Sequence, residues 1–257
     1  MSKSRFAPNS TFAPHATLPL LIWQTGNFLF GYGKKNLSFD QLVNAYPNLK
    51  WANLKQIHSD KIVESVKGVD PSMPNDALIE ADAHFTTEKN LALLIKSADC
   101  VPVLIACGSS TQPPVVCAIH AGWRGITQDI VQKAVRVLLE RGYAPTKMHV
   151  SIGPHIRQQS FEVGLDVAIE MKQTALRAGL TDLSTIIVPH AEDASKRRVD
   201  LERIVRAQLE SFQIPIASTD TVGEIDTKSS IDWSSYRRNG ASAGRNLSFI
   251  AQLPLEK

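Results

Sequence analysis

Apolar residues along the chain occur in short runs that are separated by turn residues. Runs of four to eight apolar residues bounded by Gly, Pro, Asn or Ser are typical of β-strands. The pattern therefore predicts that strands dominate the first half of the chain. The predicted strands are Leu18–Trp23, Lys61–Val66, Ala83–Thr87, Leu91–Lys96, Val101–Ala106 and Val115–Ile119.

The period of the pattern changes after Gly122-Trp123-Arg124-Gly125. From Ile126 to Leu138 apolar residues recur every four positions, which is typical of one face of a helix, and Gly142 suits its C-terminal end. Later segments predict a strand, two helices and a last strand. These are Met148–Ile152, Leu165–Ala178, Asp200–Phe212 and Leu247–Leu253.

The order of these elements predicts a mixed α/β or α+β fold, because the early strands are too densely spaced for a regular succession of strand, helix and parallel strand. No repeat, low-complexity tract or linker divides the sequence. We predict a single domain over residues 18–257. Residues 1–17, rich in Ser, Pro and Asn, are predicted to form a flexible N-terminal arm.

The composition is that of an ordinary folded chain. The 257 residues include 28 Lys or Arg and 25 Asp or Glu, a net charge of +3, and 43% are hydrophobic. This balance excludes a disordered acidic or polybasic chain. The longest basic cluster, Lys196–Arg198, is short, so no nucleic-acid partner is predicted. Neither a signal-peptide pattern nor an apolar run near the roughly 18 residues of a membrane span is seen, so no membrane association is predicted.

The three cysteines, Cys100, Cys107 and Cys117, all lie in one apolar region. Their odd number and clustering argue against a disulfide framework and for a reducing compartment, so a cytoplasmic location is predicted.

His58, Cys100 and His120 each lie at the end or start of an apolar run. A side chain at the end of a buried strand is held rigidly and can still face a cleft. Two imidazoles and a thiolate are a normal ligand set for catalytic zinc, which leaves a fourth position open, whereas a structural zinc site needs four protein ligands. The residue pattern alone leaves other interpretations open: Cys100 as a core residue, and the histidines as plain hydrogen-bonded side chains.

Two further segments carry candidate chemistry. In Gly122–Gly125 the glycines at a strand-to-helix junction allow an anion to approach backbone N–H groups, with Arg124 as charge partner. The alternative is a tight turn with Arg124 in a structural salt bridge. The basic loop Ser235–Gly240, with Arg237 and Arg238, either returns over the site or is a solvated turn.

Glu162, in Phe161-Glu162-Val163-Gly164, is either an acid in the pocket or a charge at a helix end. The residue pattern does not separate these two interpretations.

A series of short motifs resembles the YfiH family, also called the laccase-domain or multicopper polyphenol oxidase family and associated with purine nucleoside phosphorylase activity. The resemblance covers residue 18 to the end. The motifs occur in the family's order and are Lys55–Ser59, Ala81–Ala83, Ser97–Val103, Ala118–Gly125, Ile152–Pro154, Phe161–Gly164 and Ser235–Arg238.

The resemblance implies a four-layer α/β/β/α domain with mixed sheets and zinc held by His58, Cys100 and His120. It also implies a small-molecule substrate: phosphate cleaves adenosine, inosine or S-methyl-5′-thioadenosine, and some members deaminate adenosine. Other members are linked to phenol oxidation with copper or to editing of peptidoglycan precursors. The expected state is a monomer or a small homo-oligomer.

The sequence departs from the family's pattern at two places. Members commonly have Thr-Arg and a Gly-Gly-x-Ser loop after the first strand, where this chain has Gln24-Thr25-Gly26-Asn27. An arginine for substrate or phosphate is therefore missing there. Members often carry a cysteine before Ser235, where this chain has Glu224–Thr227. Both departures leave the metal ligands intact and concern substrate preference.

On this basis the predicted catalytic residues are Asp99, Arg124 and Glu162, and the predicted phosphate-binding residues are Arg124, Arg237 and Arg238. Asp99, next to Cys100, is expected to orient a ligand histidine or to act as acid or base. The usual zinc-deaminase signature, His-x-Glu with Pro-Cys-x-x-Cys, is absent, so deamination would need a different scaffold.

Three alternatives remain. A copper-dependent polyphenol oxidase would need many more histidine ligands than two. In a hydrolase or amidase, Cys100 would be the nucleophile and His120 its base. In a binding protein, the zinc would be structural.

Overall fold

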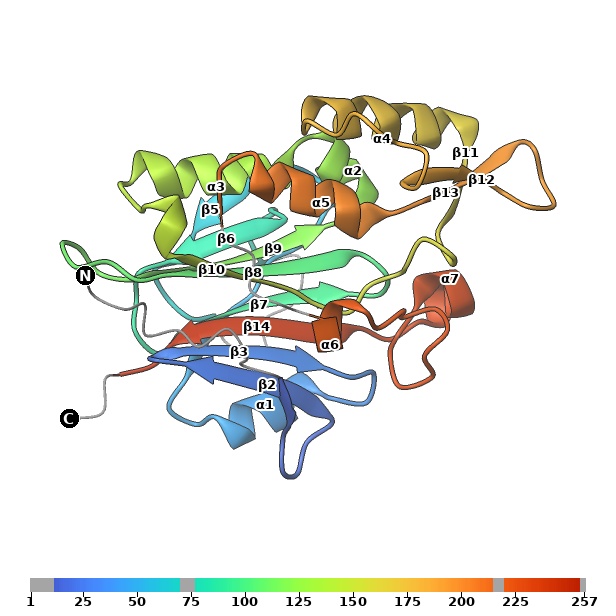
Figure 1. The fold of residues 1–257 in the computed structure, drawn as a ribbon. Helices are drawn as coiled ribbons and strands as arrows, with labels where there is room; N and C mark the ends of the chain where they lie inside the picture. Colours follow the sequence, from blue (N-terminus) through green and yellow to red (C-terminus); the bar gives the residue numbers. More distant parts are fainter. Residues whose placement is uncertain (1–11, 70–76, 215–219, 255–257) are drawn as a thin grey trace.

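Two β-sheets packed face to face form the centre of the molecule (Figure 1). The computed structural model describes residues 12–69, 77–214 and 220–254. The larger sheet has the strand order β1 (Ala13–Pro14), β2 (Leu20–Thr25), β3 (Phe28–Gly33), β14 (Asn246–Gln252), β7 (Leu91–Ser97) and β4 (Lys50–Ala52). The second has the order β10 (Met148–Ile152), β8 (Val101–Cys107), β9 (Val115–Ala121), β6 (Ala83–Thr86) and β5 (Ile62–Glu64). Among the described strands of these two sheets, β4 with β7 and β5 with β6 pair in parallel, and the other neighbours pair antiparallel.

Helices cover the outer faces of both sheets (Figure 1). Helix α1 (Phe39–Ala45) packs on the six-stranded sheet. On the other side lie α2 (Trp123–Thr127), α3 (Ile130–Glu140), α4 (Leu165–Arg177) and α5 (Leu201–Glu210). The remaining elements are the short helices α6 (Asp220–Gly223) and α7 (Tyr236–Asn239), and a small sheet of β11 (Glu162–Gly164), β13 (Lys196–Val199) and β12 (Ile187–Pro189).

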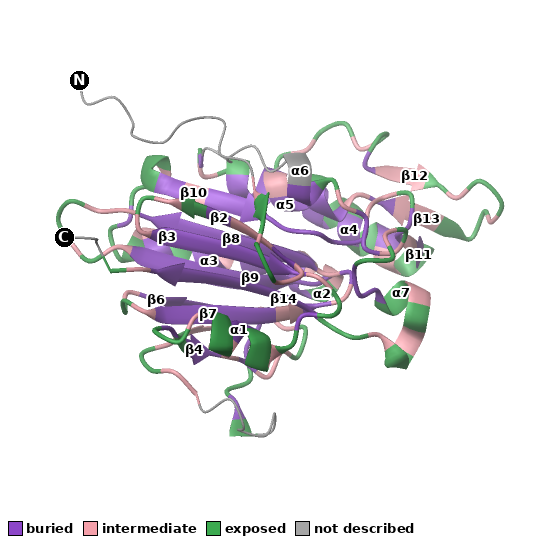
Figure 2. Cartoon of the chain, turned by 90° about the horizontal axis from the view of Figure 1, so that it is seen from below, coloured by how far each residue is buried: buried purple, intermediate pink, exposed green. Residues whose placement is uncertain are grey.

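Alternate residues of each strand enter different layers of the core, because successive side chains of a strand point to opposite faces. In β7, Leu93 packs between the two sheets and Leu94 packs toward α1. In β8, Leu104 packs between the sheets and Ile105 packs toward α3 and α5. Figure 2 shows the resulting burial of the strands. The four-layer α/β/β/α arrangement is confirmed, and it explains why the strands read as unbroken apolar runs.

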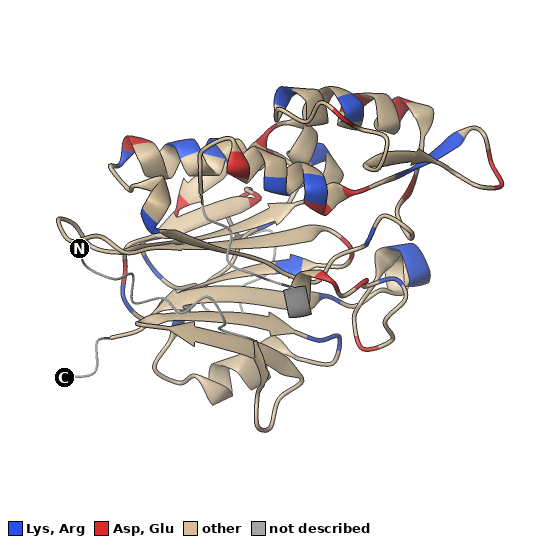
Figure 3. Cartoon of the chain, viewed as in Figure 1, with Lys and Arg blue, Asp and Glu red and all other residues tan. Residues whose placement is uncertain are grey.

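Charged side chains lie mainly on the helices and loops, and the stacked strands of the two large sheets carry few (Figure 3). Among the described residues, no helix has both the length and the apolar character required to cross a membrane.

The strands predicted from the apolar runs are all present, but the pattern missed several described elements, among them β3, β4, the small sheet of β11, β13 and β12, and α1. Glycines interrupt the aromatic run of β3. A Cβ on Gly31 would lie 2.2 Å from Phe249 Cε1, so this glycine leaves room for the Phe249 ring. The start of helix α1 does have a signal in the sequence: Ser38 and Gln41 form a capping box.

The single helix predicted from Ile126 is wrong in one respect: it is broken into α2 and α3. Asp129 between them has a φ of 62°, in the left-handed region. Its carboxylate accepts hydrogen bonds from Gln208 Nε2 (3.2 Å) and Arg177 Nη2 (3.3 Å). These long-range contacts stabilise the break between α2 and α3. A local apolar pattern gives no sign of such contacts. The predicted stop at Gly142 is confirmed, with φ +83°.

Most of the predicted N-terminal arm, residues 1–11, lies outside the described residues. Ala13 and Pro14 pair with Ile22 and Leu21 as β1, so sheet pairing begins before the predicted start at Leu18.

Candidate metal centre

Two chain connections that cross from one sheet to the other meet at one end of the sandwich. The connection from β4 to β5 carries His58, the turn from β7 to β8 carries Cys100, and His120 lies near the end of β9. One ligand atom from each of the three lies within 4.8 Å of the others. The structure therefore brings together the three predicted metal ligands.

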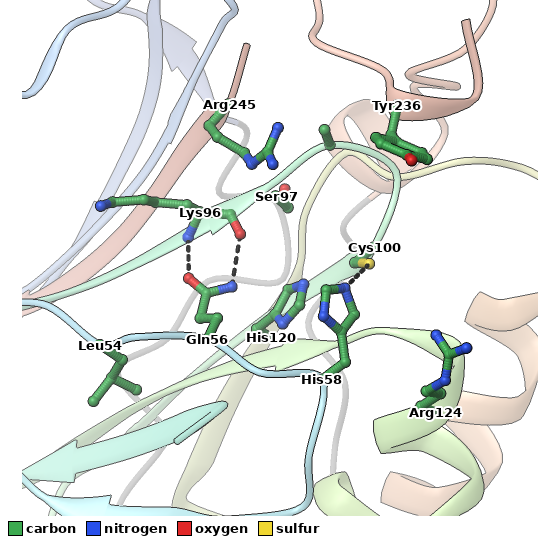
Figure 4. Close-up of a pocket in the computed structure, with 11 residues that line it drawn as sticks. Leu54, Gln56, His58, Lys96, Ser97, Cys100, His120, Arg124, Tyr236 and Arg245 are labelled. Carbon is green, nitrogen blue, oxygen red and sulfur yellow. Dashed lines mark hydrogen bonds between the residues drawn. The ribbon is translucent and has the colours of Figure 1, made fainter. Parts of the chain in front are cut away.

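The spacing of this triad fits a tetrahedral ion. Cys100 Sγ lies 4.0 Å from His58 Nε2 (Figure 4). Nitrogen and sulfur ligands of tetrahedral zinc lie about 3.6 Å apart, given bond lengths of about 2.1 and 2.3 Å. His58 is exposed, Cys100 is partly exposed and His120 is buried, so the triad is closed on one side and open on the other. Three ligands with an open side fit a catalytic rather than a structural ion.

Asp82 fixes the loop that carries His58. Its carboxylate accepts hydrogen bonds from the backbone N–H groups of Ile57 (3.2 Å), His58 (3.0 Å) and Ser59 (2.6 Å). These bonds stabilise His58 in the left-handed region, at a φ of 59°.

The side chain of Gln56 explains the Gln-x-His motif. Its Nε2 donates to Lys96 O and its Oε1 accepts from Lys96 N, both at 2.7 Å (Figure 4). The amide thus continues the pairing at the edge of β7, two residues before His58. The hydrogen bonds of the Gln56 amide therefore position the loop that carries His58.

Asp82 also orients His120. The Asp82 Oδ1 atom lies 2.9 Å from His120 Nδ1. Because an ionised carboxylate can only accept, Nδ1 carries the proton and Nε2 is left as the metal-binding atom. The role that the sequence suggested for Asp99, orienting a ligand histidine, therefore belongs to Asp82. Its signal in the sequence was a carboxylate, in Ala81-Asp82-Ala83, at the start of a buried strand.

Gly122 provides the space that the triad needs. A Cβ on this residue would lie 3.1 Å from His58 Cδ2 and 3.2 Å from Cys100 Sγ. Any side chain here would push two of the three ligands. The glycine of the His-Ala-Gly-Trp-Arg-Gly motif thus allows close packing against the ligands, and α2, only five residues long, begins directly after it.

The electrostatics of the triad favour the metal-binding form of the thiol. Burial would raise the pKa of Cys100, but the imidazoles of His120 and His58 outweigh it and lower this pKa to about 6. Burial would lower the pKa of His120, yet Cys100 and Asp82 raise it to about 9. Burial also acts to raise the pKa of Asp82, which hydrogen bonds from His120 and Ser59 lower to about 2. Cys100 is therefore a thiolate at neutral pH.

The triad lies at the junction of two cavities. The first, about 520 Å³, is lined by Lys96, Ser97 and Arg245, and the second, about 420 Å³, by Trp123, Phe161 and Glu162. Both are also lined by His58, Cys100, Arg124 and Tyr236. No Asp or Glu is among the residues described as lining the first cavity, so its cations are not neutralised there.

Arg124 lies at this junction, as its predicted role requires. Its guanidinium stacks on the Trp123 ring at 4.5 Å. Within residues 12–69, 77–214 and 220–254 it forms no ion pair, which disagrees with the alternative of a structural salt bridge.

The two arginines of the Ser235–Arg238 motif have different positions. Arg237 lines the second cavity, where its Nη1 donates to Glu162 O at 2.7 Å. Arg238 donates to the backbone carbonyls of its own loop, those of Thr227, Lys228, Ser230 and Trp233. Arg238 is not among the residues described as lining either cavity, and its guanidinium holds the loop together, so the structure does not place it with Arg124 and Arg237.

The two remaining predicted catalytic residues also occupy defined places. Glu162 lines the second cavity, and its carboxylate lies 3.5 Å from His190 Nε2. Asp99 accepts from Thr227 Oγ1 and from the backbone N–H of Arg237, both at 2.7 Å. Asp99 therefore joins the Cys100 turn to the Arg237 loop.

The structure also locates the two departures from the family's pattern. In Gln24–Asn27, the first two residues end β2, and Gly26 and Asn27 form the turn that leads to β3. β14 pairs with Ser97 at its start and with Phe28 at its end, so this turn lies at the opposite end of the sheet from the triad. The substitution there does not concern the metal centre. The second departure, Glu224–Thr227, supplies the Thr227 hydroxyl bound by Asp99.

The described residues contain one group of at least three His, Cys, Asp or Glu side chains arranged to hold a metal, the triad itself. Arg245 is a functional candidate that sequence reasoning missed, and its position directly before the last strand was the available signal.

Comparisons with known proteins identify the family of the chain. The family model described as multi-copper polyphenol oxidoreductase laccase matches residues 35–252. A purine nucleoside phosphorylase of Clostridium acetobutylicum is 31% identical over 226 residues, which cover 84% of this chain and 85% of that protein. One from Rickettsia conorii is 39% identical over 110 residues, 43% of this chain, and the match spans only 41% of that protein's length.

An adenosine deaminase from an unknown prokaryotic organism is 27% identical over 199 residues, 76% of this chain and 72% of that protein. Among solved structures, YlmD from Geobacillus stearothermophilus has the same fold, with a TM-score of 0.80 at 20% identity over 96% of this chain and 100% of that chain.

Proposed function

The chain belongs to the family described as multi-copper polyphenol oxidoreductase laccase, and from this premise we propose that it is a zinc-dependent purine nucleoside phosphorylase. Its substrates would be adenosine and inosine, with S-methyl-5′-thioadenosine as a related candidate. Relatives that bear the name purine nucleoside phosphorylase support this choice within the family.

One observation carries the proposal: the triad lies between a cavity lined by cations without a described carboxylate and a second cavity that has aromatic and aliphatic side chains beside its charged ones. Lys96, Arg124 and Arg245 line the first cavity without a carboxylate among the lining residues described, which favours an anion such as phosphate. Trp123, Phe161 and further apolar side chains line the second, which suits a purine base. Phosphorolysis needs phosphate and the purine base on opposite sides of one reacting centre.

The residues of the site would divide the work as follows. A zinc ion held by His58, Cys100 and His120 would supply Lewis-acid polarisation of an atom bound at its open side. Arg124, at the junction of the cavities, would position phosphate and offset developing charge. Arg237 would close the nucleoside side, and Asp99 would hold the Arg237 backbone in place.

The bond changes balance without any redox partner. A phosphate oxygen forms a bond to C1′ of the ribose as the bond from C1′ to N9 of the purine breaks. The electron pair of that bond leaves with the base, which takes up the proton that hydrogen phosphate gives up when it becomes the ribose 1-phosphate dianion. Two carboxyl groups line the second cavity, and Asp99 is already hydrogen-bonded to Thr227 and to the Arg237 backbone. Glu162 is the other and would hydrogen-bond to the departing base.

The direct test incubates the purified, zinc-loaded protein with inosine or adenosine and phosphate. We expect free hypoxanthine or adenine together with ribose 1-phosphate, measured by chromatography, and no product when phosphate is left out. Protein that binds zinc and forms neither product would overturn the proposal.

Adenosine deamination is a second candidate, favoured by the relative of that name. It is tested in the same assay without phosphate, where inosine and ammonia would form.

A third candidate is favoured by the order Cys100, His120, Asp82, since a thiolate, an imidazole and an orienting carboxylate also make a nucleophilic site. Activity on amide substrates that resists chelation and is lost on alkylation of Cys100 would support that function instead. A copper-dependent polyphenol oxidase would show oxygen uptake on a diphenol. The single group of ligands among the described residues is small for a multicopper enzyme.

A further inference from the structure

Ser97, the last residue of β7, has a buried hydroxyl group that is not hydrogen-bonded. Its side chain is 2% exposed and lines the first cavity. Across the described part of the chain, its Oγ has no hydrogen-bond partner. A buried polar group without a partner lowers stability, so it is usually kept for a ligand or a water.

Arg245 approaches the same place from the neighbouring strand. It precedes Asn246, which is the pairing partner of Ser97 between β14 and β7. Its Nη1 donates to two carbonyls of its own loop, Ala243 O and Gly244 O, both at 3.0 Å. Within the described ranges it forms no ion pair, so its charge faces the cavity without a carboxylate.

A second cation adds to the positive charge on this side. Lys96 also lines the first cavity, and burial together with the charge of Arg245 lowers its pKa. The amide of Gln56 is already hydrogen-bonded to the Lys96 backbone. The Lys96 side chain extends away from the triad in Figure 4. The donors of this wall that lie nearer the triad and lack a partner among the described residues are the Ser97 hydroxyl and the remaining N–H groups of Arg245.

The wall formed by Ser97 and Arg245 lies across the triad from Arg124 (Figure 4). Ser97 and Arg245 line the first cavity, whereas Arg124 lines both. We propose that Ser97 and Arg245 form a subsite for phosphate oxygens, which holds inorganic phosphate in the first cavity while the nucleoside occupies the second. This inference rests on the proposed phosphorolysis and names the residues, beyond Arg124, that bind its anionic substrate.

The test measures KM for phosphate and for inosine in zinc-loaded Ser97→Ala and Arg245→Gln. We expect the phosphate KM to rise about tenfold or more, since each variant removes a hydrogen bond to a charged ligand. The inosine KM should stay within about twofold of wild type. Arg203→Gln removes the same charge from the exposed face of α5 and should change neither value. An unchanged phosphate KM in both Ser97→Ala and Arg245→Gln would overturn the subsite.

Thermal unfolding separates ligand binding from a structural role. Because the Ser97 hydroxyl has no partner, Ser97→Ala should unfold at the wild-type temperature or above it. A lower unfolding temperature with an unchanged phosphate KM would show a structural hydroxyl and overturn the inference.

Isothermal titration of inorganic phosphate into zinc-loaded protein without nucleoside keeps the two proposals distinguishable. Phosphate binding that is lost in Arg245→Gln supports the subsite, even if the wild type shows no phosphorolysis. Phosphorolysis with normal phosphate binding in Arg245→Gln overturns the subsite and leaves the function standing. A second arm uses inosine 5′-monophosphate: tighter binding than inorganic phosphate, lost in the same variant, would overturn the assignment to the free ion.

Discussion

The two ends of the β-sandwich carry cavities of similar volume and opposite character. The cavity at the metal end measures about 520 Å³, and the one beside the β2–β3 turn about 540 Å³. Cations, imidazoles and a thiolate line the first. Amide and apolar side chains, among them Gln24, Asn27 and Leu253, line the second, and no charged side chain is described there. Volume alone therefore does not distinguish a reactive site from a surface hollow.

Cysteines show the same contrast. At the metal end, two imidazoles lower the pKa of Cys100 to about 6 against the effect of burial. Elsewhere in the five-stranded sheet, burial raises the pKa of Cys107 to about 11 and that of Cys117 to about 12. The residue type is the same, and the neighbouring charges decide whether it is a ligand or a core thiol.

The backbone at the two ends differs as well. Left-handed residues near the far cavity are Gly26 and Asn90, which adopt positive φ at little cost. At the metal end they are His58 and Asp99, with φ of 59° and 93°. Hydrogen bonds to the carboxylates of Asp82 and Asp99 hold these two turns. The unfavourable backbone conformations therefore lie where the side chains of the site must converge.

Removing the thiolate should have the largest effect. We expect Cys100→Ala to lose zinc to near background and with it the phosphorolysis, since two imidazoles alone make a weak site. Metal analysis by mass spectrometry measures the loss. Cys117→Ala is the matched control: it should keep its zinc and lose about 1 kcal/mol of unfolding free energy. Full zinc content in Cys100→Ala would contradict the assignment of this ligand.

Removing the carboxylate that orients His120 should have the next largest effect. Asp82→Asn is expected to weaken zinc binding about 10- to 100-fold, because the His120 tautomer and the His58 loop both depend on it. Competition with a chromogenic chelator measures the affinity. Asp99→Asn is the control, expected to keep zinc affinity and to raise the KM for inosine through the Arg237 loop. Equal zinc loss in both variants would contradict the division of roles between the two carboxylates.

The thiol pKa values predict a pH-dependent difference between the cysteines in metal-free protein. A thiol with a pKa of about 6 is about nine-tenths thiolate at pH 7, compared with about 3% for an ordinary thiol, a roughly 30-fold difference. Alkylation of Cys100 by iodoacetamide should rise with pH through about 6 and be lost as pH falls below it. Cys107 and Cys117 should react only after unfolding. Peptide mapping of the labelled protein gives the three rates, and a Cys100 midpoint above pH 8 would disprove the expectation.

Filling the space at Gly122 should have the smallest of these effects. In Gly122→Ala the new methyl group would press on His58 and Cys100 at 3.1 and 3.2 Å, so we expect zinc affinity to fall about fivefold, close to 1 kcal/mol. Gly108→Ala is the control, because nothing lies within 4 Å of its Cβ position. Wild-type zinc affinity in Gly122→Ala would show that the ligands shift without cost.

Much of this architecture was predictable from the sequence. Short apolar runs and a period-four apolar pattern located most strands and the longer helices, because burial of one or two faces leaves a local signature. The motifs around His58, Cys100 and His120 also identified the metal ligands through the family resemblance. β3 was missed because glycines interrupt its apolar run. Gly31 leaves room for the ring of Phe249, a residue near the other end of the sequence.

Roles within the site were less predictable. Asp99 adjoins Cys100 in the sequence, yet Asp82, 38 residues before His120, is the residue that contacts the imidazole. Arg237 and Arg238 are neighbours, yet one lines a cavity and the other binds carbonyls of its own loop. Adjacency in sequence does not fix where a side chain points after a turn.

The sequence by itself determined most of the apolar strands and the apolar helix faces, since these depend on residue type and local period. The four-layer arrangement and the three candidate metal ligands were predicted from the resemblance of its motifs to the family. Only the tertiary structure decided which carboxylate orients His120, which arginines face the cavities, and that the Gln24–Asn27 turn lies far from the site. The physical reason is that these properties depend on strand order and on the two connections that cross between the sheets. Such connections bring together residues that are far apart in the sequence. Their separation along the chain does not indicate how close they lie in space.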